Sequence, residues 1–351
     1  MSQEATLVRR RIKVTALTAS RHDPSRRFRV SQFVAPLARL GIDLTDYYPR
    51  ISKYTPAPVP QLGFVWTAGK LLARLPGVVA GRGSDITLLQ RELVPGRRTF
   101  EKLAGRRLLF DVDDAVWLGQ HSDSIKRIIE GCRGVIAGNE FLADYFRRLG
   151  ARVWVVPTSV DTEVWKPAPK RGSNEWVVGW SGTSSNLKYL YALEEPLADF
   201  LTRRPDAKLV VVSDREPRFE KIPDECWRFE RWSPEQEVRQ VQQMDTGLMP
   251  LAATDWERGK CGCKMLTYMA VGAATIASPV GVGGEILRQS EVGCAAHTQD
   301  DWYNALTRLY DDRELTCHLG AAGRTFLEER YSVSRSAATL ADIFKQVADE
   351  D

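Results

Sequence analysis

One loop of the chain concentrates basic residues at the predicted start of a helix. The segment 256–264 carries Arg258, Lys260 and Lys264, and a helical pattern begins near Gly262. The N-terminal end of a helix dipole repels cations, so three of them at this place require an anion between them. A donor diphosphate is such an anion, and we predict that these four residues bind it. A solvated loop whose charges point apart is the alternative.

Two other turns after predicted strands contain small residues suited to a phosphate-bearing ligand. Gly182 and Thr183 stand between a strand and a helix, where free backbone N–H groups favour a phosphate, although an ordinary capped turn is as compatible. Gly284 belongs to a glycine-rich stretch that opens another helix. Glu285, beside it, could bind sugar hydroxyls or complement the helix dipole. We predict that all four residues bind the donor.

Three carboxylates gather at the end of a predicted strand, at Asp111, Asp113 and Asp114. An Asp-x-Asp metal site is one interpretation. Acceptor contact or acid/base catalysis by Asp113 or Asp114 is a second, and N-capping of the next segment is a third. Because the basic loop already supplies positive charge for phosphates, we predict Asp113 and Asp114 as the catalytic residues and no metal site.

The segments Ser25–Arg29 and Gln90–Glu92 also follow predicted strands of the first half. Within them, Arg29, Arg91 and Glu92 are the candidates for binding an acceptor. The six cysteines are scattered and show neither a disulfide framework nor a zinc-binding spacing.

The charge of the chain is unevenly distributed along its 351 residues. The formal net charge is +4, but residues 1–165 hold 26 basic and 16 acidic residues, a balance of +10 that leaves −6 for the rest. A basic first half suits an anionic partner, such as a phosphorylated or lipid-linked acceptor or an acidic membrane face, and a merely soluble basic surface is the alternative. Nucleic acid is disfavoured because no stripe of interleaved basic and aromatic residues is present. We expect a cytoplasmic protein, since no apolar run approaches the roughly 20 residues of a membrane helix.

Short apolar runs alternate with helical patterns along the whole chain, which predicts parallel sheets covered by helices. A linker rich in proline and charge begins at Lys166. We therefore predict an α/β protein with two Rossmann-like, doubly wound domains that face a central cleft. The first spans residues 1–165 and the second spans 166–333. A tail helix in 334–351 is expected to pack back on the first domain.

Five motifs together resemble the family-4, or group 1, glycosyltransferases, and most closely a bacterial subgroup. They read Gln90–Glu92, Phe110–Leu118, Ala137–Ala143, Pro157–Thr162 and Trp256–Lys264. The resemblance spans nearly the whole chain and implies a GT-B fold with a nucleotide-diphosphate sugar as donor substrate. It also implies transfer with retention to a glycan, a lipid-linked or a small-molecule acceptor, without an obligatory metal or other cofactor.

The chain departs from the family at two acidic positions. The usual Glu-x7-Glu pair falls on Gly259 and Thr267, and Glu257 is displaced by two residues. The hypothesis is that Arg258, Lys260 and Lys264 carry the cationic role instead. The missing acids leave two alternatives open, a catalytically inactive GT-B protein that binds or scaffolds and a nucleotide-sugar epimerase on the same fold.

Overall fold

The structure is a computed structural model that describes residues 10–21, 23–59, 61, 63–97, 99–118, 122–169 and 175–350. The chain divides into two compact units. The first unit comprises Met1–Pro157 and Val333–Asp351, and the second comprises Thr158–Ser332. The linker expected from residue 166 therefore lies within the second unit, and the chain passes between the units at Pro157 and again at Ser332.

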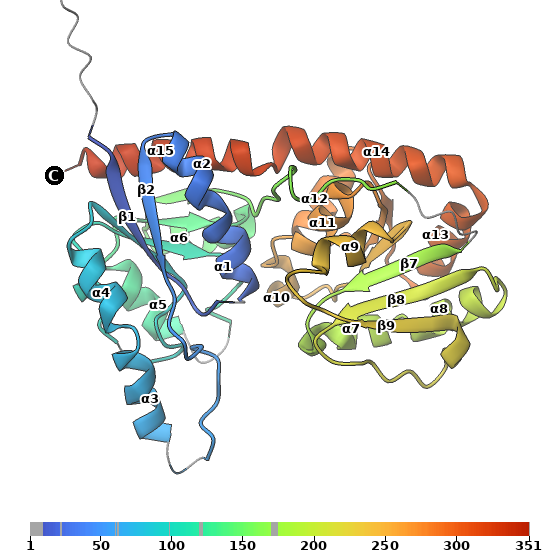
Figure 1. The fold of residues 1–351 in the computed structure, drawn as a ribbon, viewed down its shortest axis with the longest axis horizontal. Helices are drawn as coiled ribbons and strands as arrows, with labels where there is room; N and C mark the ends of the chain where they lie inside the picture. Colours follow the sequence, from blue (N-terminus) through green and yellow to red (C-terminus); the bar gives the residue numbers. More distant parts are fainter. Residues whose placement is uncertain are drawn as a thin grey trace, which may run out of the picture. The chain divides into compact units, whose positions relative to one another are not determined.

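The first unit contains a six-stranded parallel sheet with helices on both faces (Figure 1). Its elements are β1 (Ile12–Leu17), α1 (Pro24–Arg29), η1 (Ser31–Phe33), α2 (Val34–Arg39), β2 (Ile42–Tyr47), α3 (Gly63–Leu72), α4 (Leu75–Arg82), β3 (Ile86–Gln90), η3 (Glu101–Leu103), β4 (Leu108–Val112), α5 (Ser122–Ile129), β5 (Gly134–Ala137), α6 (Glu140–Arg148), β6 (Val153–Val155) and α15 (Val333–Ala348).

The second unit is built in the same way around a second six-stranded sheet. Its elements are β7 (Trp176–Ser181), η4 (Ser184–Asn186), α7 (Leu187–Tyr191), α8 (Glu194–Thr202), β8 (Ala207–Ser213), η5 (Asp224–Cys226), β9 (Trp227–Arg231), α9 (Glu237–Gln242), β10 (Thr246–Met249), α10 (Asp255–Arg258), α11 (Cys263–Ala270), β11 (Ala274–Ala277), α12 (Gly281–Gln289), β12 (Cys294–Ala295), α13 (Gln299–Asp311) and α14 (Arg313–Arg330).

Strand order fixes where ligands can bind in each sheet. The orders are β2-β1-β3-β4-β5-β6 and β12-β11-β10-β7-β8-β9, with every pair parallel. The prediction of two doubly wound α/β domains is confirmed. In such sheets a crevice opens at the carboxyl edge where the strand order reverses. That point lies between β1 and β3 in the first unit and between β7 and β10 in the second.

One predicted helix is broken in two for a clear reason. The sequence over 187–201 has the apolar pattern of a single helix, but α7 ends at Tyr191 and α8 begins at Glu194. Pro196 has no N–H to donate to the carbonyl of Ala192, so the helix cannot continue through this point. The side chain of Gln299 satisfies that carbonyl at 2.7 Å instead.

Each unit has its own apolar core. Phe33, Leu37 and Ile42 of the first unit are fully buried together with Leu340 and Phe344 of α15. The tail helix therefore contributes core residues to the first unit, where it lies against α2 (Figure 1). Among the described residues, no helix is both long and apolar enough to cross a membrane.

A buried tyrosine holds the second sheet together where β7 and β10 separate. The two strands pair only at Thr246 with Val178 and Gly247 with Gly179. Beyond that point, the hydroxyl of Tyr268 accepts a hydrogen bond from the Ser181 N–H at 2.9 Å and donates to the Leu248 carbonyl at 3.3 Å. The phenol thus takes the place of the missing strand-to-strand bond.

Replacing Tyr268 by Phe should leave both backbone groups buried without this partner. We expect the free energy of unfolding to fall by about 1–3 kcal/mol, the cost of an unsatisfied buried polar group. Chemical denaturation followed by fluorescence measures the change. Tyr303→Phe is the matched control, because no described residue forms a hydrogen bond with the Tyr303 hydroxyl; equal effects of the two substitutions would contradict the prediction.

Candidate functional site

Arg91 occupies the carboxyl edge of the first sheet beside the crevice between β1 and β3. It follows the last residue of β3 and has φ of +57°, the one positive value among the described non-glycine residues. An L-residue in the left-handed region is held there by its surroundings, at a cost of about 1–3 kcal/mol, and such residues concentrate at functional sites.

The side chain of Arg91 contacts residues from three other segments, which are helix α1, the loop after β2 and the loop after β4. Its Nε donates to Asp113 Oδ1 at 2.7 Å and its Nη2 to Asp114 Oδ2 at 2.5 Å. The same Nη2 donates to Ser25 Oγ at 3.0 Å, and Nη1 donates to the Tyr54 hydroxyl at 3.2 Å. We call these five residues the Arg91 cluster. The structure therefore brings the two predicted catalytic aspartates together with one predicted acceptor-binding residue.

The electrostatics of the cluster favour ionised carboxylates. Burial raises the pKa of the Asp113 carboxyl, but the charge of Arg91 and hydrogen bonding by Ser25 outweigh it, and the net shift is downward. Burial alone would lower the pKa of Arg91, yet the two carboxylates raise it well above its usual value. A carboxylate with a lowered pKa is a weak general base near neutral pH. The arrangement is better suited to orienting a hydroxyl than to removing its proton.

A buried lysine supports the backbone on either side of Arg91. The ammonium of Lys53 donates to the carbonyls of Gln90 at 2.8 Å and Glu92 at 3.0 Å. These are the two residues that flank Arg91, so Lys53 stabilises the left-handed turn through its backbone. Burial, followed by the positive charge of Arg91, lowers the pKa of Lys53 to about 7.

The other two predicted acceptor-binding residues are buried in structural interactions. Arg29 Nη2 pairs with Asp111 Oδ1 at 2.6 Å, and both side chains are almost fully buried. Glu92 accepts hydrogen bonds from the Gly96 N–H at 3.1 Å and the Ser124 hydroxyl at 2.5 Å. An acceptor role for Arg29 or Glu92 stays a prediction. In the structure their hydrogen bonds connect the loops at the carboxyl edge of the first sheet.

All three strand-end carboxylates are engaged by arginines. Asp111 is paired with Arg29, while Asp113 and Asp114 share Arg91. Within the described ranges, no three His, Cys, Asp or Glu side chains are grouped so that they could hold a metal ion. Each of the three carboxylates thus has an arginine partner, and the absence of a metal site stays a prediction.

In the second unit, Lys264 lies against the turn that follows β7. A Cβ built on Gly182 would stand 2.7 Å from Lys264 Cε and 2.8 Å from the Trp180 ring, so only glycine fits there. The Lys264 ammonium lies 5.0 Å from the centre of that ring. Burial, then the nearby charge of Lys260, lowers the pKa of Lys264 to about 8. Among the described residues, no carboxylate lies within ion-pair distance of Lys264.

Two glycines with positive φ bring the neighbouring helix starts to the same edge. Gly262 (φ +69°) is the N-cap of α11, and a Cβ there would meet Val282 of α12 at 3.1 Å. Gly281 (φ +54°) begins α12, and a Cβ there would lie 2.8 Å from the carbonyl oxygen of Arg258. The predicted residues Gly262, Lys264 and Gly182 therefore converge at the edge formed by β7, β10 and β11, which we call the Lys264 corner.

The remaining predicted donor-binding residues differ in their surroundings. Arg258 is exposed and pairs with Asp255 at 3.1 Å, and Lys260 stands 5.5 Å from the Trp256 ring centre. Thr183 is exposed and accepts a hydrogen bond from Asn186 at 2.8 Å. Gly284 packs against the Pro279 backbone, from which a Cβ at position 284 would lie only 2.6 Å away. Glu285 is half-buried near Tyr331, whose phenol pKa is raised first by burial and then by the charge of Glu285.

Glu257 does not stand in for the missing acids of the family. Its carboxylate is buried and accepts hydrogen bonds from the hydroxyls of Tyr189 and Thr254. At one of the two vacant positions, the Thr267 hydroxyl is buried and donates to the Lys264 carbonyl at 2.8 Å. The first turn of α11 thus exposes no acid in place of the expected pair.

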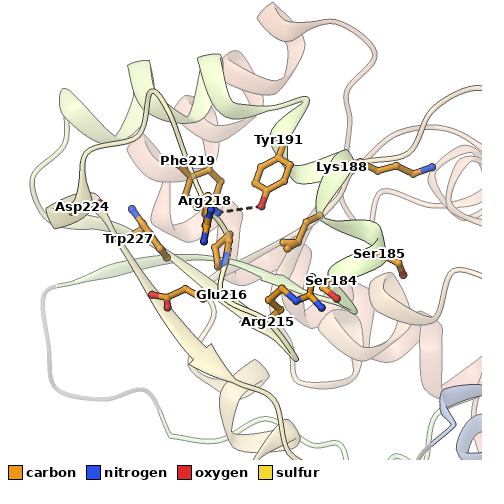
Figure 2. A pocket seen from close by; sticks show the side chains of 12 residues that line it. Ser184, Ser185, Lys188, Tyr191, Arg215, Glu216, Arg218, Phe219, Asp224 and Trp227 are labelled. Carbon is orange, nitrogen blue, oxygen red and sulfur yellow. Dashed lines mark hydrogen bonds between the residues drawn. The ribbon is translucent and has the colours of Figure 1, made fainter. Parts of the chain in front are cut away.

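A cavity of about 1200 Å³ adjoins the residues that follow Gly182 and Thr183 (Figure 2). It lies between α7 and the loop that joins β8 to β9. Its lining alternates basic side chains with aromatic rings and includes two acids. The lining residues are Ser184, Ser185, Leu187, Lys188, Tyr191, Arg215, Glu216, Pro217, Arg218, Phe219, Asp224 and Trp227.

Several residues of these sites carry no recognisable pattern in the sequence. Tyr54 and Lys53 lie in a long loop, and only the fold brings them to Arg91. Trp180 and Tyr268 belong to apolar runs that predict a core and nothing more. Ser25, by contrast, falls in a segment that the sequence does point to.

The lowered pKa of Lys53 predicts a stability that depends on pH. Between pH 7 and about 10 the unfolded chain keeps a proton on Lys53 that the folded chain releases, so the contribution of Lys53 to stability should rise with pH. We therefore expect wild type to gain stability relative to Lys53→Met as the pH rises. The free energy of unfolding of wild type minus that of the variant should increase by up to about 1.4 kcal/mol per pH unit over this window. Urea denaturation at several pH values measures it.

Lys126→Met, at an exposed lysine of the same unit, should differ from wild type by an amount independent of pH. A difference for Lys53→Met that is equally flat would show that the buried ammonium is not destabilised.

Solved structures similar to this chain share its fold. HepE from Anabaena, in complex with UDP and glucose, has a TM-score of 0.65 at 14% identity, covering 96% of this chain and 100% of that one. Sucrose-phosphate synthase from Thermosynechococcus elongatus has 0.70 at 14%, covering 96% and 99%. WaaG, a glycosyltransferase involved in lipopolysaccharide biosynthesis, has 0.67 at 12%, covering 95% and 99%. The chain thus has the GT-B fold of these proteins.

A search of curated proteins found no match. The family model described as glycosyl transferases group 1 matches residues 176–312, which lie within the second unit and contain most of the residues of the Lys264 corner.

Proposed function

We propose that the protein is a glycosyltransferase that takes its sugar from a nucleotide-diphosphate donor. The observation that carries the proposal is the Lys264 corner. It presents a lysine without a carboxylate partner at the switch point of a unit whose sequence matches group 1 glycosyl transferases. An anion that binds there would raise the lowered pKa of Lys264 and resolve the unfavourable placement of positive charge beside the start of α11.

We propose that the diphosphate lies between Gly182 and the start of α11. The absence of a side chain at Gly182 lets Lys264 lie against this turn, and Lys260 and Lys264 supply charge for the leaving nucleoside diphosphate. Thr183, Arg258, Gly262, Gly284 and Glu285 complete the proposed donor site. The adjoining cavity offers aromatic rings and basic side chains, which suit the nucleoside part of the donor. The solved complex of HepE with UDP-glucose supports a nucleotide sugar as the ligand.

The Arg91 cluster is the proposed acceptor site. Asp113 and Asp114 are both held by hydrogen bonds from Arg91, and their carboxylate oxygens can accept hydrogen bonds from an acceptor hydroxyl. The lowered pKa of Asp113 favours its ionised form. In this proposal the leaving phosphate takes the proton, the aspartates orient the acceptor, and the anomeric configuration is retained. Neither a metal nor another cofactor takes part, since the cationic side chains stabilise the departing diphosphate.

The acceptor is proposed to be a glycan, a lipid-linked sugar or a small molecule. The basic first half favours a lipid-linked acceptor presented at an anionic membrane face, with the protein associating peripherally from the cytoplasm. An inactive binding protein and a nucleotide-sugar epimerase remain the competing functions. An epimerase would convert the donor with no acceptor present, whereas an inactive protein would bind the donor and release no nucleotide.

Removing the two lysines of the proposed donor site should abolish donor binding. Wild type at a concentration of nucleotide sugar about 100 times the dissociation constant should gain about 2.7 kcal/mol of stability. The Lys260→Ala/Lys264→Ala variant should gain none, because the diphosphate loses its charge partners. Differential scanning fluorimetry against a panel of nucleotide-diphosphate sugars measures both. Lys221→Ala, an exposed lysine outside the proposed donor site, is the control; an unchanged response of the double variant would refute the assignment.

Asp113→Asn tests the acceptor site independently of the donor site. Loss of the ionised carboxylate should lower sugar transfer by about 10²-fold or more, within the range typical of positioned catalytic groups, while the donor dissociation constant stays unchanged. Turnover is measured by nucleotide release, and the anomer of the product is read by NMR. Full activity of the variant, or an inverted product in wild type, would overturn this part of the proposal.

A further inference from the structure

Helix α3 carries its apolar residues on the outside. Phe64 is 87% exposed, and Val65 and Leu72 are each 65% exposed. Positions 64, 65, 68 and 72 share one stripe of a helix with 3.6 residues per turn, so these side chains form a single face. The opposite side of α3 presents Lys70, which is buried and donates to the Lys53 carbonyl at 2.9 Å. This is the reverse of an ordinary surface helix.

The apolar face continues onto the next helix. Val79 of α4 is 66% exposed and Leu75 is 39% exposed. Helix α4 packs on β1 and β3 with its other side, while α3 projects beyond α4 and away from the sheet of its unit (Figure 1). We call Phe64, Val65, Leu72, Leu75 and Val79 the α3–α4 face.

The chain segment that contains the α3–α4 face has only positively charged side chains. Residues 47–84 include five basic residues and no acidic one. Arg82 is exposed at the end of α4, three positions after Val79, and Arg50 is exposed in the loop that precedes α3. The three buried ones, Lys53, Lys70 and Arg74, donate hydrogen bonds to backbone carbonyls, and among the described residues none of them forms an ion pair with a carboxylate. The carboxylates of Asp23 and Glu92 act on the pKa of Lys53 without pairing with it.

We propose that the α3–α4 face docks on the surface of an anionic lipid bilayer. An exposed apolar stripe flanked by arginines matches the interface, where apolar side chains enter the acyl boundary and cations meet anionic headgroups. A protein partner would be expected to meet polar or acidic side chains at the edge of such a face, and the segment offers it only cations and apolar groups. The proposal locates the membrane association put forward above on named residues, and it does not require that the protein transfer a sugar.

Sedimentation with lipid vesicles tests the proposal on the full chain. Wild type should bind phosphatidylcholine vesicles that contain about 30% phosphatidylglycerol at least about tenfold more tightly than pure phosphatidylcholine, and about 0.5 M salt should remove most of the difference. Phe64→Asp/Leu72→Asp should bind the anionic vesicles at least about tenfold more weakly, because two apolar anchors are lost and negative charge is added. Arg50→Ser/Arg82→Ser should lose the preference for anionic lipid while keeping the residual binding to neutral vesicles.

Val164→Asp is the matched control, since Val164 is 56% exposed in the second unit and lies outside the face. It should bind vesicles as wild type does. Thermal unfolding of every variant, together with unchanged nucleotide-sugar affinity of Phe64→Asp/Leu72→Asp, separates loss of docking from loss of folding or of donor binding. Absence of vesicle binding by wild type, or wild-type binding by the double variant, would overturn the proposal. So would a wild-type dimer that Phe64→Asp/Leu72→Asp makes monomeric without any effect on lipid binding.

Discussion

Parallel strand pairing is the constraint on which both candidate sites depend. In a parallel sheet every strand ends at the same edge, so the residues that follow the strands meet there however far apart they lie in the sequence. Ser25, Arg91 and Asp113 come together because β1, β3 and β4 are neighbours in strict register. In the second unit the same rule brings Gly182 against Lys264, after β7 and after β10.

The two edges differ in how their charge is balanced. In the first unit Arg29 is paired with one carboxylate of the same edge and Arg91 with two, so each arginine has an ionic partner within the protein. In the second unit Lys264 has an aromatic ring beside it and no described carboxylate within reach. A buried charge without a partner is costly, and an anionic ligand can offset that cost whereas a neutral hydroxyl of an acceptor cannot. This asymmetry supports the division of roles proposed for the two units.

Much of the architecture follows from local pattern, while the contacts that build the sites do not. Short apolar runs bounded by glycine and polar residues predict the strands, and β5 has the bounds expected from its sequence. The burial of Arg29 against Asp111 depends on two segments 82 positions apart, which spacing alone cannot pair. The outward orientation of the apolar side of α3 cannot be predicted from its sequence, because helical periodicity does not say which side of a helix faces the core. Pro196 by itself predicts a helix break, but the continuous apolar pattern around it favours a single helix.

Tyr268 links the shape of the second sheet to the set of sequences that can form it. Its ring occupies the space over Gly247, where a Cβ would lie 2.3 Å from the ring, while its hydroxyl reaches Ser181 and Leu248. A phenylalanine keeps the ring and loses the bridge, and any side chain at 247 displaces the ring itself. Glycine at 247 and tyrosine at 268 should therefore vary together in evolution or not at all. Loss of this pair would change the shape of the crevice between β7 and β10 even if every residue that binds a ligand were kept.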